Sequence, residues 1–235
     1  QTGPSAMAED APPAMAVPQA GQDGLMLLKR IGQIDPKSIE DYLAAGGYDA
    51  LARAFEMEPS EIIAEVKAAN LLGRGGAAFP AGVKWESTAA QPAEPRYLIC
   101  NADESEPGTF KDRVILEGDP FLLIEAMTIA GYAIGAAHGY IYLRGEYPHS
   151  RWRLDNAIRL AREHGYLGED IHGTGWSFDI EIRRGAGAYV CGEETAIFNS
   201  IEGYRGEPRS KPPFPFEQGL FGKPTVVNNV ETLCN

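Results

Sequence analysis

The sequence predicts an α/β fold, in which a Rossmann-like sheet carries flanking helices. Strand-like and helix-like stretches alternate over most of the chain, a pattern typical of parallel strands connected by helices. The 235 residues are enough for one large core or two modest domains, and 27 glycines suit a loop-rich globular protein. We find no internal repeat.

The N-terminal part of the chain divides into two segments. Residues 1–23 are rich in Ala, Pro and Gly and predict a disordered linker. Residues 24–72 predict a helical lead-in of three short helices, because Pro36 and Pro59 mark helix starts and glycines mark the stops. Since the chain begins with Gln and ends in "VETLCN", we expect a piece of a longer protein.

Residues 73–235 predict the α/β domain itself. Its last section, residues 203–229, predicts a Pro- and Gly-rich loop, which is unusually long for a simple connection. The remaining elements follow in chain order: strands at 96–101, 139–148 and 178–185, and helices at 120–137, 151–165 and 193–202.

Composition excludes several classes of protein. The formal charge of −12, from 21 basic and 33 acidic side chains, argues against a nucleic-acid binder and against binding to an anionic membrane surface. No apolar run is long enough for a membrane span, and the start lacks the charged head and apolar core of a signal peptide. We therefore expect no direct membrane insertion.

The three cysteines, Cys100, Cys191 and Cys234, lie far apart in the sequence. Without a CxxC pair they predict neither a zinc site nor an iron–sulfur cluster in these residues. A sparse, odd number of cysteines favours a reducing compartment, so we expect a cytoplasmic protein.

The first candidate loop is "GRGGAAFPAGVKW", residues 73–85. Gly73, Gly75 and Ala78 match part of the GxGxxG pattern, but they follow a predicted helix instead of a strand, so we expect no true Rossmann dinucleotide site. Glycines beside Arg74 and Lys84 still suit a phosphate cradle, because backbone N–H groups can approach a ligand where no Cβ intervenes. A strained connection with incidental charges is the alternative.

The second candidate loop is "CNADESEPGTFKD", which follows a predicted strand. Ligands of α/β sheets bind beyond the carboxyl ends of strands, so these amides and carboxylates lie in the right place for a site that binds flavin or sugar groups. A hydrolase with paired carboxylates, built on Asp103, Glu104 and Glu106, and a solvated acidic turn are both alternatives.

The third candidate loop is "GAGAYVCGEETA". Gly185, Gly187 and Gly192 leave the backbone bare before a predicted helix, whose N-terminus carries unpaired N–H groups and partial positive charge. That end attracts an anion, but Glu193 and Glu194 themselves can satisfy it.

Together these stretches resemble a known family. "GRGGAAFPAGVKW", "NADESEPGTFKD", "GAGAYVCGEETA" and "KPPFP…GKPT.VNNVETL" are similar to the NADH-binding flavoprotein subunit of respiratory complex I and its soluble relatives, over roughly residues 50–235. Those relatives include subunits of NAD-dependent formate dehydrogenases and the diaphorases of NAD-reducing hydrogenases. The lead-in "IDPKSIEDYLAAGGYDALARAF" looks more like the soluble formate dehydrogenase or hydrogenase type.

The resemblance implies that the Rossmann-like domain holds FMN. The phosphate and ribityl chain are expected near the first loop and the final asparagines, and the isoalloxazine ring near the second and third loops. The implied FMN residues are Gly73, Arg74, Gly75, Lys84, Asn101, Asp103, Ser105, Tyr189, Gly192, Glu193, Asn228 and Asn229.

The resemblance also implies that NADH stacks on the flavin. The adenine is expected between Phe79 and Phe214, with Lys211 as a basic contact to the dinucleotide. Glu106 and Glu194 fall where the family has acids near the nicotinamide and ribose. No protein nucleophile is needed, because the protein holds the two rings together.

Electrons are expected to leave through iron–sulfur centres outside these residues. The family continues into an SLBB domain and a domain with a [4Fe–4S] cluster, which we expect beyond residue 235. Expected partners are a thioredoxin-like [2Fe–2S] subunit and a larger subunit rich in iron–sulfur clusters, with formate dehydrogenase first among the possible complexes. A non-catalytic relative used for assembly is the alternative.

Two residues depart from the family pattern. Ala78 stands where glycine is usual, which changes the close backbone approach at that point. Phe198 replaces a smaller aliphatic residue, which we expect to alter helix packing and leave the chemistry unchanged.

Overall fold

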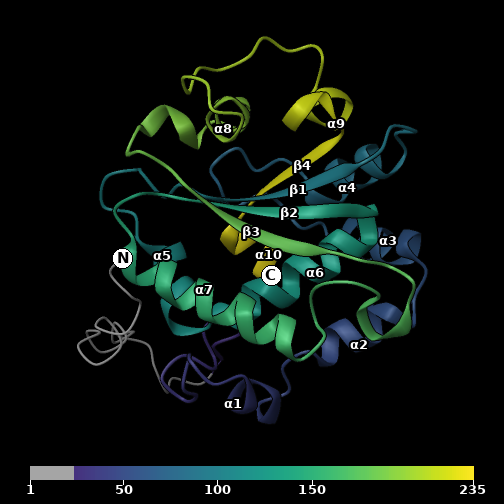
Figure 1. The fold of residues 1–235 in the computed structure, drawn as a ribbon, viewed down its shortest axis with the longest axis vertical. Coiled ribbons are helices and arrows are strands. Elements are labelled where there is room, and N and C mark those ends of the chain that lie inside the picture. The colour runs from purple at the N-terminus through teal and green to yellow at the C-terminus, as the bar shows by residue number, and fades with distance from the viewer. Residues whose placement is uncertain (1–23) are drawn as a thin grey trace, which may run out of the picture.

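A four-stranded parallel sheet forms the centre of the computed structural model, which describes residues 24–235 (Figure 1). The predicted linker 1–23 lies outside the described residues. The strand order is β3-β2-β1-β4, and each neighbouring pair is parallel. The strands are β1 (Arg96–Ala102), β2 (Ala136–Leu143), β3 (Asp179–Arg184) and β4 (Thr225–Asn229).

The fourth strand corrects one of our predictions. Residues 203–229 were expected to form a single loop, but its last five residues form β4, which pairs with β1. Four of these five residues are buried, so β4 has no alternation of polar and apolar side chains that would mark it in the sequence. The strand predicted at 139–148 begins earlier, at Ala136, and ends at Leu143.

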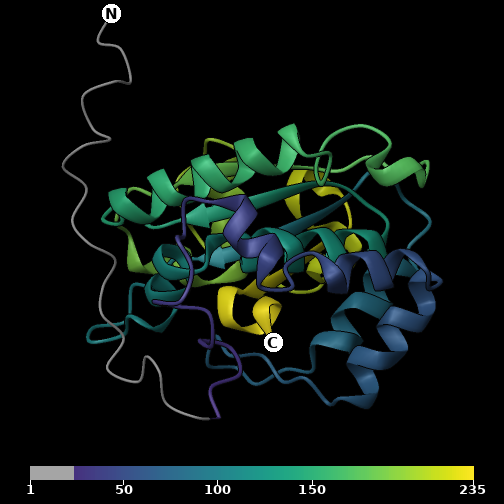
Figure 2. The same ribbon diagram turned by 90° about the horizontal axis from the view of Figure 1, so that it is seen from below.

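The helical lead-in is confirmed as three helices, and these share the main core with the sheet. Ile39, Leu51 and Ile62 belong to the same cluster of buried side chains as Leu98 of β1. Figures 1 and 2 show these helices on the same side of the sheet as the C-terminus. The helices are α1 (Ile39–Ala44), α2 (Asp49–Phe55) and α3 (Pro59–Ala68).

Seven further helices cover the sheet, and four of them were not predicted: α4, α5, α9, which lies within the predicted loop 203–229, and α10. Residues 81–85 were expected to continue a loop but form the start of α4, and residues 111–118, between the polar loop and the long helix, form α5. The helix predicted at 120–137 ends at Ile134, because Gly135 adopts a left-handed backbone. The seven are α4 (Ala81–Ala89), α5 (Lys111–Gly118), α6 (Pro120–Ile134), α7 (Pro148–Glu163), α8 (Glu194–Ile201), α9 (Pro215–Gln218) and α10 (Val230–Cys234).

The two faces of the sheet bury different clusters. Alternate residues of a strand point to opposite faces, so Leu98 and Cys100 belong to the core under α6, while Ile99 packs with Phe198 of α8. Phe198 is buried in this second cluster, so it contributes to the packing of α8 against the sheet.

The strand order places a switch point between β1 and β4. The chain moves outward from β1 to β2 and β3, and then returns to pair β4 on the other side of β1. Asn101 at the end of β1 lies opposite Asn229 at the end of β4. Ligands of open α/β sheets bind beyond the carboxyl ends of strands at such a reversal, so this edge is where a site is expected.

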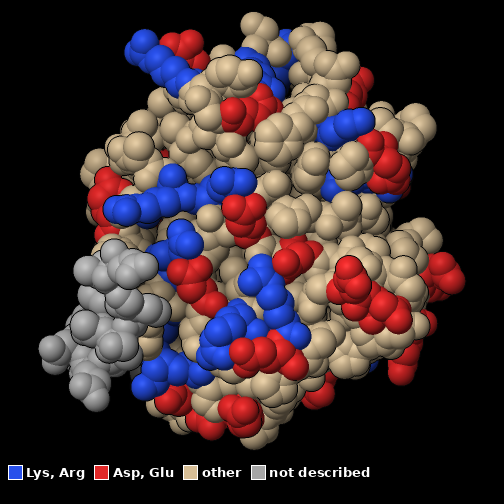
Figure 3. Space-filling model, in the orientation of Figure 1, with Lys and Arg blue, Asp and Glu red and all other residues tan. Residues whose placement is uncertain are grey.

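Charges of both signs are mixed over the surface. On the face shown in Figure 3, basic and acidic side chains lie beside one another without a continuous patch of one sign. Along α7, for example, Arg151 pairs with Asp155 and Arg159 pairs with Glu163. Among the described helices, none combines the length and apolar character needed to cross a lipid bilayer. Residues 24–235 contain no group of three or more His, Cys, Asp or Glu side chains suited to a metal ion.

Candidate functional site

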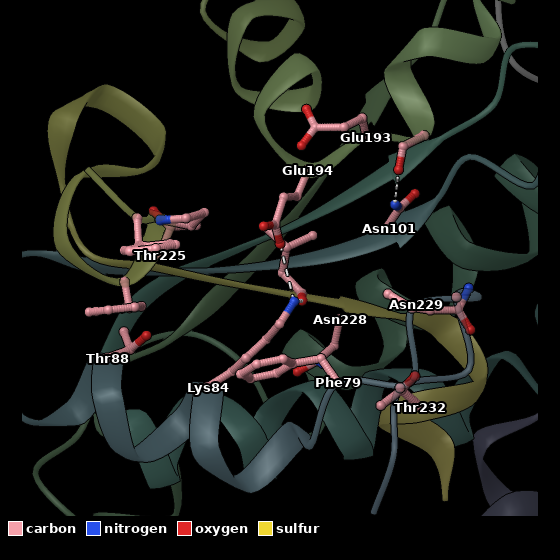
Figure 4. Close-up of a pocket in the computed structure, with 18 of the residues that line it drawn as sticks. Phe79, Lys84, Thr88, Asn101, Glu193, Glu194, Thr225, Asn228, Asn229 and Thr232 are labelled. Carbon is pink, nitrogen blue, oxygen red and sulfur yellow. Dashed lines mark hydrogen bonds and ion pairs between the residues drawn. The ribbon is translucent and has the colours of Figure 1, made fainter. Parts of the chain in front are cut away.

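A pocket of about 640 Å³ lies at the switch point (Figure 4). This volume falls in the range of small-molecule sites. The pocket is formed by the first and third loops, α4, the ends of β1 and β4, and the segment around α9. It is lined by Gly73, Gly75, Ala77, Ala78, Phe79, Lys84, Thr88, Asn101, Gly192, Glu193, Glu194, Lys211, Phe214, Pro215, Phe216, Thr225, Val227, Asn228, Asn229 and Thr232.

The asparagines at the strand ends are held in fixed orientations. Trp85 Nε1 donates to Asn228 Oδ1 at 2.8 Å inside the core. Asn229 Oδ1 accepts from Lys111 at 3.0 Å, and its Nδ2 donates to Asp112 at 2.7 Å. These contacts fix which side of each amide is oxygen and which is nitrogen, so two preoriented amides lie at the floor of the pocket.

The first loop is held by a backbone hydrogen bond between its two ends, and N–H groups in its middle have no backbone partner among the described residues. Gly73 N donates to Phe79 O at 2.9 Å, and a Cβ on Gly73 would lie only 3.3 Å from that oxygen. Within residues 24–235, the N–H groups of Gly75 and Gly76 donate to no backbone acceptor. Free backbone donors beside a pocket are what an anionic group needs, as the sequence predicted.

Ala78 adopts a left-handed backbone in this loop, with φ of +50°. Glycine, which the resemblance implies at this position, reaches this region without the steric cost that a Cβ imposes. The departure noted in the sequence is therefore a strained residue on the pocket wall, directly before Phe79.

Glu193 caps the helix that follows the third loop. Its carboxylate accepts from the backbone N–H groups of Thr195 at 2.8 Å and Ala196 at 3.0 Å. The helix dipole and two orphan donors of α8 are thus satisfied by Glu193, which is the alternative that the sequence left open for this residue.

Glu194 has a different environment. It lies between two lysines: Lys84 Nζ is 3.1 Å from one of its oxygens, and Lys211 Nζ is 2.6 Å from the other. Figure 4 shows the Glu194 carboxylate pointing toward Lys84 across the pocket. Burial raises the pKa of Glu194, but the two lysines outweigh burial and hold this pKa below its ordinary value. The carboxylate is therefore ionised at neutral pH.

Aromatic rings form two walls of the pocket. Phe79 is 48% exposed and Phe214 is 45% exposed, although both line the pocket, so their ring faces are available to a ligand. Lys84 Nζ lies 5.8 Å from the centre of the Phe79 ring. Phe214 stacks on Phe216 with the ring centres 5.6 Å apart and the planes 4° from parallel. Flat heterocycles bind to such faces.

The third loop and the second loop meet at the upper rim of the pocket. Asn101 Nδ2 donates to Gly192 O at 2.9 Å, and a Cβ on Gly192 would lie 3.6 Å from Asp103 Oδ2. That Asp103 oxygen is buried and has no hydrogen-bond partner among the described residues. Burial raises the pKa of Asp103. An unpaired buried oxygen beside the pocket is a group that a ligand donor can satisfy.

Not every predicted residue lines the pocket. Arg74 N donates to Thr232 Oγ1 at 2.8 Å, and the Arg74 side chain lines a second cavity, near Cys234. Tyr189 is 65% exposed and donates to Glu106 Oε2 at 2.7 Å. The predicted residues outside the pocket lining are Arg74, Asp103, Ser105, Glu106 and Tyr189, and their roles remain predictions.

Several lining residues were missed by sequence reasoning. Phe216 lies two residues after Phe214 in the same Pro-rich stretch, and this spacing was the available signal. The three threonines lack such a signal, because they reach the pocket only through the packing of α4, β4 and α10. The missed residues are Ala77, Thr88, Pro215, Phe216, Thr225, Val227 and Thr232.

Most of the chain matches the model of a known protein family. The model of the Nuo51 FMN-binding domain matches residues 66–235. The chain belongs to the Nuo51 FMN-binding domain family. Two curated proteins illustrate the similarity: an NADH-quinone oxidoreductase component of Aquifex aeolicus (strain VF5), 58% identical over 210 residues, and the HndC component of an NADP-reducing hydrogenase of Solidesulfovibrio fructosivorans, 55% identical over 207 residues.

The similarity covers nearly all of this chain but only part of each relative. The matches span 89% and 88% of the chain, and 49% and 42% of those two proteins, so the chain spans about half the length of its curated relatives. Among solved structures, the NAD⁺-reducing [NiFe]-hydrogenase in the H₂-reduced state is similar with a TM-score of 0.72 and 41% identity. That match covers 88% of this chain and 33% of the hydrogenase chain.

The residues of this Nuo51 FMN-binding domain fit the cofactor that its family name specifies. The glycine loop offers bare backbone donors to a phosphate, and the paired amides of Asn228 and Asn229 offer polar partners beside it. The unpaired Asp103 oxygen and the open Gly192 backbone lie beside Asn101, where a polar ring edge is expected. The pocket has a suitable volume for such a ligand.

Proposed function

We propose that this chain is an FMN- and NAD(H)-binding electron-transfer module, which moves electrons between NADH/NAD⁺ and iron–sulfur clusters of a larger complex. One observation carries the proposal: bare glycines, oriented amides and exposed phenylalanines from distant parts of the sequence converge on a single pocket. Bare backbone donors suit a phosphate, and exposed phenylalanine rings suit a flat heterocycle.

FMN, when bound, supplies an acceptor that takes two electrons from a nicotinamide and passes them on one at a time. The protein residues bind and orient. Phe79 and Phe214 offer ring faces to an adenine, and Lys211 lies near enough to contact the dinucleotide. Restricting both rings to one pocket converts a bimolecular encounter into a positioned one.

We propose one set of residues for NAD(H) and a second set for FMN. Phe79, Glu106, Glu194, Lys211 and Phe214 are proposed to contact NAD(H). Glu106 and Tyr189 hydrogen-bond each other beside the pocket, so this pair must separate or shift for either to contact the nicotinamide end. The proposed FMN contacts are Gly73, Arg74, Gly75, Lys84, Asn101, Asp103, Ser105, Tyr189, Gly192, Glu193, Asn228 and Asn229.

The finer identity of the complex is also a proposal. The lead-in sequence resembles the soluble formate dehydrogenase or hydrogenase type. Of these we place a cytoplasmic NAD-dependent formate dehydrogenase first, with a thioredoxin-like [2Fe–2S] subunit and a larger iron–sulfur subunit as expected partners. A diaphorase of an NAD-reducing hydrogenase and an NADH-dehydrogenase subunit of complex I remain alternatives, because an NAD⁺-reducing hydrogenase and an NADH-quinone oxidoreductase subunit are both similar to this chain. A [4Fe–4S] cluster is expected beyond residue 235.

Cofactor extraction tests the proposal directly. The complete protein is purified with its native partners, denatured, and the released flavin is identified and counted. One FMN per chain supports the proposal, and the absence of flavin from a folded protein contradicts it. Formate, hydrogen and NADH are then supplied separately as reductants of the holoenzyme, and reduction by formate identifies the formate dehydrogenase type. A bound flavin that none of the three reductants reduces would identify a non-catalytic relative used for assembly.

A further inference from the structure

The segment from Gly203 to Phe214 carries two residues of the site but has little burial of its own. Ten of its twelve residues are exposed; only Gly206 and Arg209 are partly buried. Lys211 and Phe214 lie at its far end, above the pocket. An exposed loop with few apolar contacts has low local stability, so its position depends on specific polar contacts.

Arg209 makes four of these contacts. Its Nε donates to Asn199 Oδ1 at 2.9 Å, and its Nη2 donates to Glu202 Oε2 at 2.5 Å. Its backbone N donates to Thr195 Oγ1 at 2.8 Å. All three acceptors are on α8 or its C-cap, which is the helix that begins beside Glu194.

The same guanidinium also reaches the other end of the Pro-rich stretch. Arg209 Nη1 donates to Gly219 O at 3.3 Å, immediately after α9. Its Cζ lies 5.6 Å from the centre of the buried Phe198 ring, which belongs to α8. A planar guanidinium can satisfy several acceptors in fixed directions at once, which an ammonium cannot do. Arg209 thus joins α8 to both sides of the turn that holds Lys211 and Phe214.

We propose that Arg209 is the positioning residue of the nucleotide side of the pocket: it fixes the loop so that Phe214 lines the pocket and Lys211 pairs with Glu194. Arg209 does not line the pocket, so it acts through these residues and not on a ligand. This inference rests on the proposed NAD(H) function, because the affected property is the binding of a dinucleotide.

The geometry makes the role specific to the guanidinium. Lysine at 209 keeps the charge but reaches only one of the separated acceptors. Alanine removes the three side-chain hydrogen bonds and leaves the backbone hydrogen bond to Thr195. Arg205 is the matched control, because it lies in the same loop, has an 89% exposed side chain and, within residues 24–235, forms an ion pair only with Glu207. Changing Arg205 alters the net charge equally without touching α8.

The test compares Arg209→Lys, Arg209→Ala and Arg205→Ala with the wild type in the complete protein. Steady-state NADH oxidation gives KM and kcat, and extraction gives FMN per chain. We expect KM for NADH to rise about tenfold in Arg209→Ala and less in Arg209→Lys, with kcat within about twofold and FMN content unchanged. Added guanidinium is expected to lower KM of Arg209→Ala alone. Arg205→Ala is expected to match the wild type.

Hydrogen–deuterium exchange of residues 203–219 gives a readout that does not depend on NADH. Faster exchange confined to this segment in Arg209→Ala, together with the KM rise, supports the proposal. An unchanged KM with faster exchange shows that Arg209 orders the loop without positioning the site, which overturns it. Equal KM changes in Arg205→Ala, or exchange that is unchanged, also overturn it. If the wild type binds no NADH, the proposed function itself has failed, and the exchange data still report the loop contact separately.

Discussion

The Glu194 carboxylate accepts a hydrogen bond from Lys84 Nζ at 3.1 Å, which joins the third loop to α4 across the pocket. Its other oxygen lies 2.6 Å from Lys211 Nζ, so one carboxylate connects three segments that are far apart in the sequence. The pair is partly shielded from water, with 29% of the Lys84 side chain and 24% of the Glu194 side chain exposed. A fixed negative charge therefore lies between two cations at the centre of the site.

Replacing Glu194 by Gln is expected to weaken binding of the product NAD⁺. A carboxylate favours the cationic nicotinamide ring of NAD⁺ over the neutral ring of NADH, and removing it removes that preference. We expect the inhibition constant for NAD⁺ to rise about threefold to tenfold, measured by product inhibition of NADH oxidation. Unchanged NADH affinity and unchanged product inhibition would refute the role of Glu194.

The same substitution makes stability depend less on pH. The pKa of Glu194 is lowered from its ordinary 4.5 in the folded state, so its ionised form stabilises the fold above that pH. This contribution, about 1 kcal/mol for a partly exposed pair, is lost as the pH falls through the folded pKa. Urea unfolding at pH 7 and at pH 3 measures it: the difference between wild type and Glu194→Gln is expected at pH 7 and should shrink at pH 3. A difference that persists at pH 3 contradicts the ion-pair origin.

Gly192→Ala is expected to fold normally and to lose flavin. A Cβ at this position would lie 3.6 Å from Asp103 Oδ2, which is an ordinary contact, so the protein itself can accommodate it. Gly192 lines the pocket, however, and a methyl group there occupies ligand space. Circular dichroism and FMN content measured together check this. Full FMN content in the folded variant would show that the flavin does not approach Gly192.

Phe214→Leu is expected to raise KM for NADH about fivefold, because the stacking of a flat base on an aromatic ring is worth about 1 kcal/mol beyond burial. FMN content and kcat should not change. Phe221→Leu is the control, because Phe221 is comparably exposed, at 47%, but does not line the pocket. Equal effects from both variants would mean that Phe214 contributes no specific stacking.

Ala78→Gly is expected to stabilise the fold by up to about 1 kcal/mol. Ala78 has φ of +50°, where an L-residue with a Cβ is strained and glycine is not. Ala77 is the matched control, since it lies in the same loop without a positive φ, and Ala77→Gly should be neutral or destabilising. Denaturant unfolding distinguishes the two. A loss of stability in Ala78→Gly would show that the Ala78 methyl makes contacts that outweigh the strain.

Tyr42→Phe is expected to destabilise the fold by about 1–2 kcal/mol, because it removes one buried hydrogen bond to a charged group. Tyr42 OH donates to Glu125 Oε2 at 2.5 Å, and the backbone N–H groups of Tyr48 and Leu51 donate to the same carboxylate. These contacts attach the lead-in helices to α6. NADH oxidation per FMN should be unchanged, because none of the three residues lines the pocket. A stability equal to that of wild type would mean that Glu125 is satisfied without Tyr42.

Much of the fold was predictable from the sequence, and the exceptions have physical causes. Alternating strands and helices correctly predicted a parallel α/β sheet, but α4 was missed because a glycine and a proline stand at its start. Gly82 is required there, since a Cβ on it would lie 2.5 Å from the Lys67 side chain of α3. That requirement comes from packing between two helices, which no local pattern reveals.

The approximate place of the site, at the carboxyl ends of the strands, could be predicted from the sequence, but the contacts of each side chain could not. The glycines, Asn101 and the paired asparagines lie together because all follow strands or loops at one edge of the sheet. Glu193 and Glu194 are neighbours with identical chemistry, yet one caps α8 and the other pairs with two lysines. The two roles differ because the two side chains point in different directions, and these directions cannot be read from the sequence.

The most direct test of the account is an anaerobic titration of the complete, purified protein with NADH, followed by its visible absorption spectrum. The account predicts a flavin band that bleaches when NADH is added, and a Gly192→Ala protein that is folded but lacks this band. A folded wild-type protein that has no flavin band, or has one that NADH leaves unchanged, would contradict the claim that this pocket joins FMN to NADH.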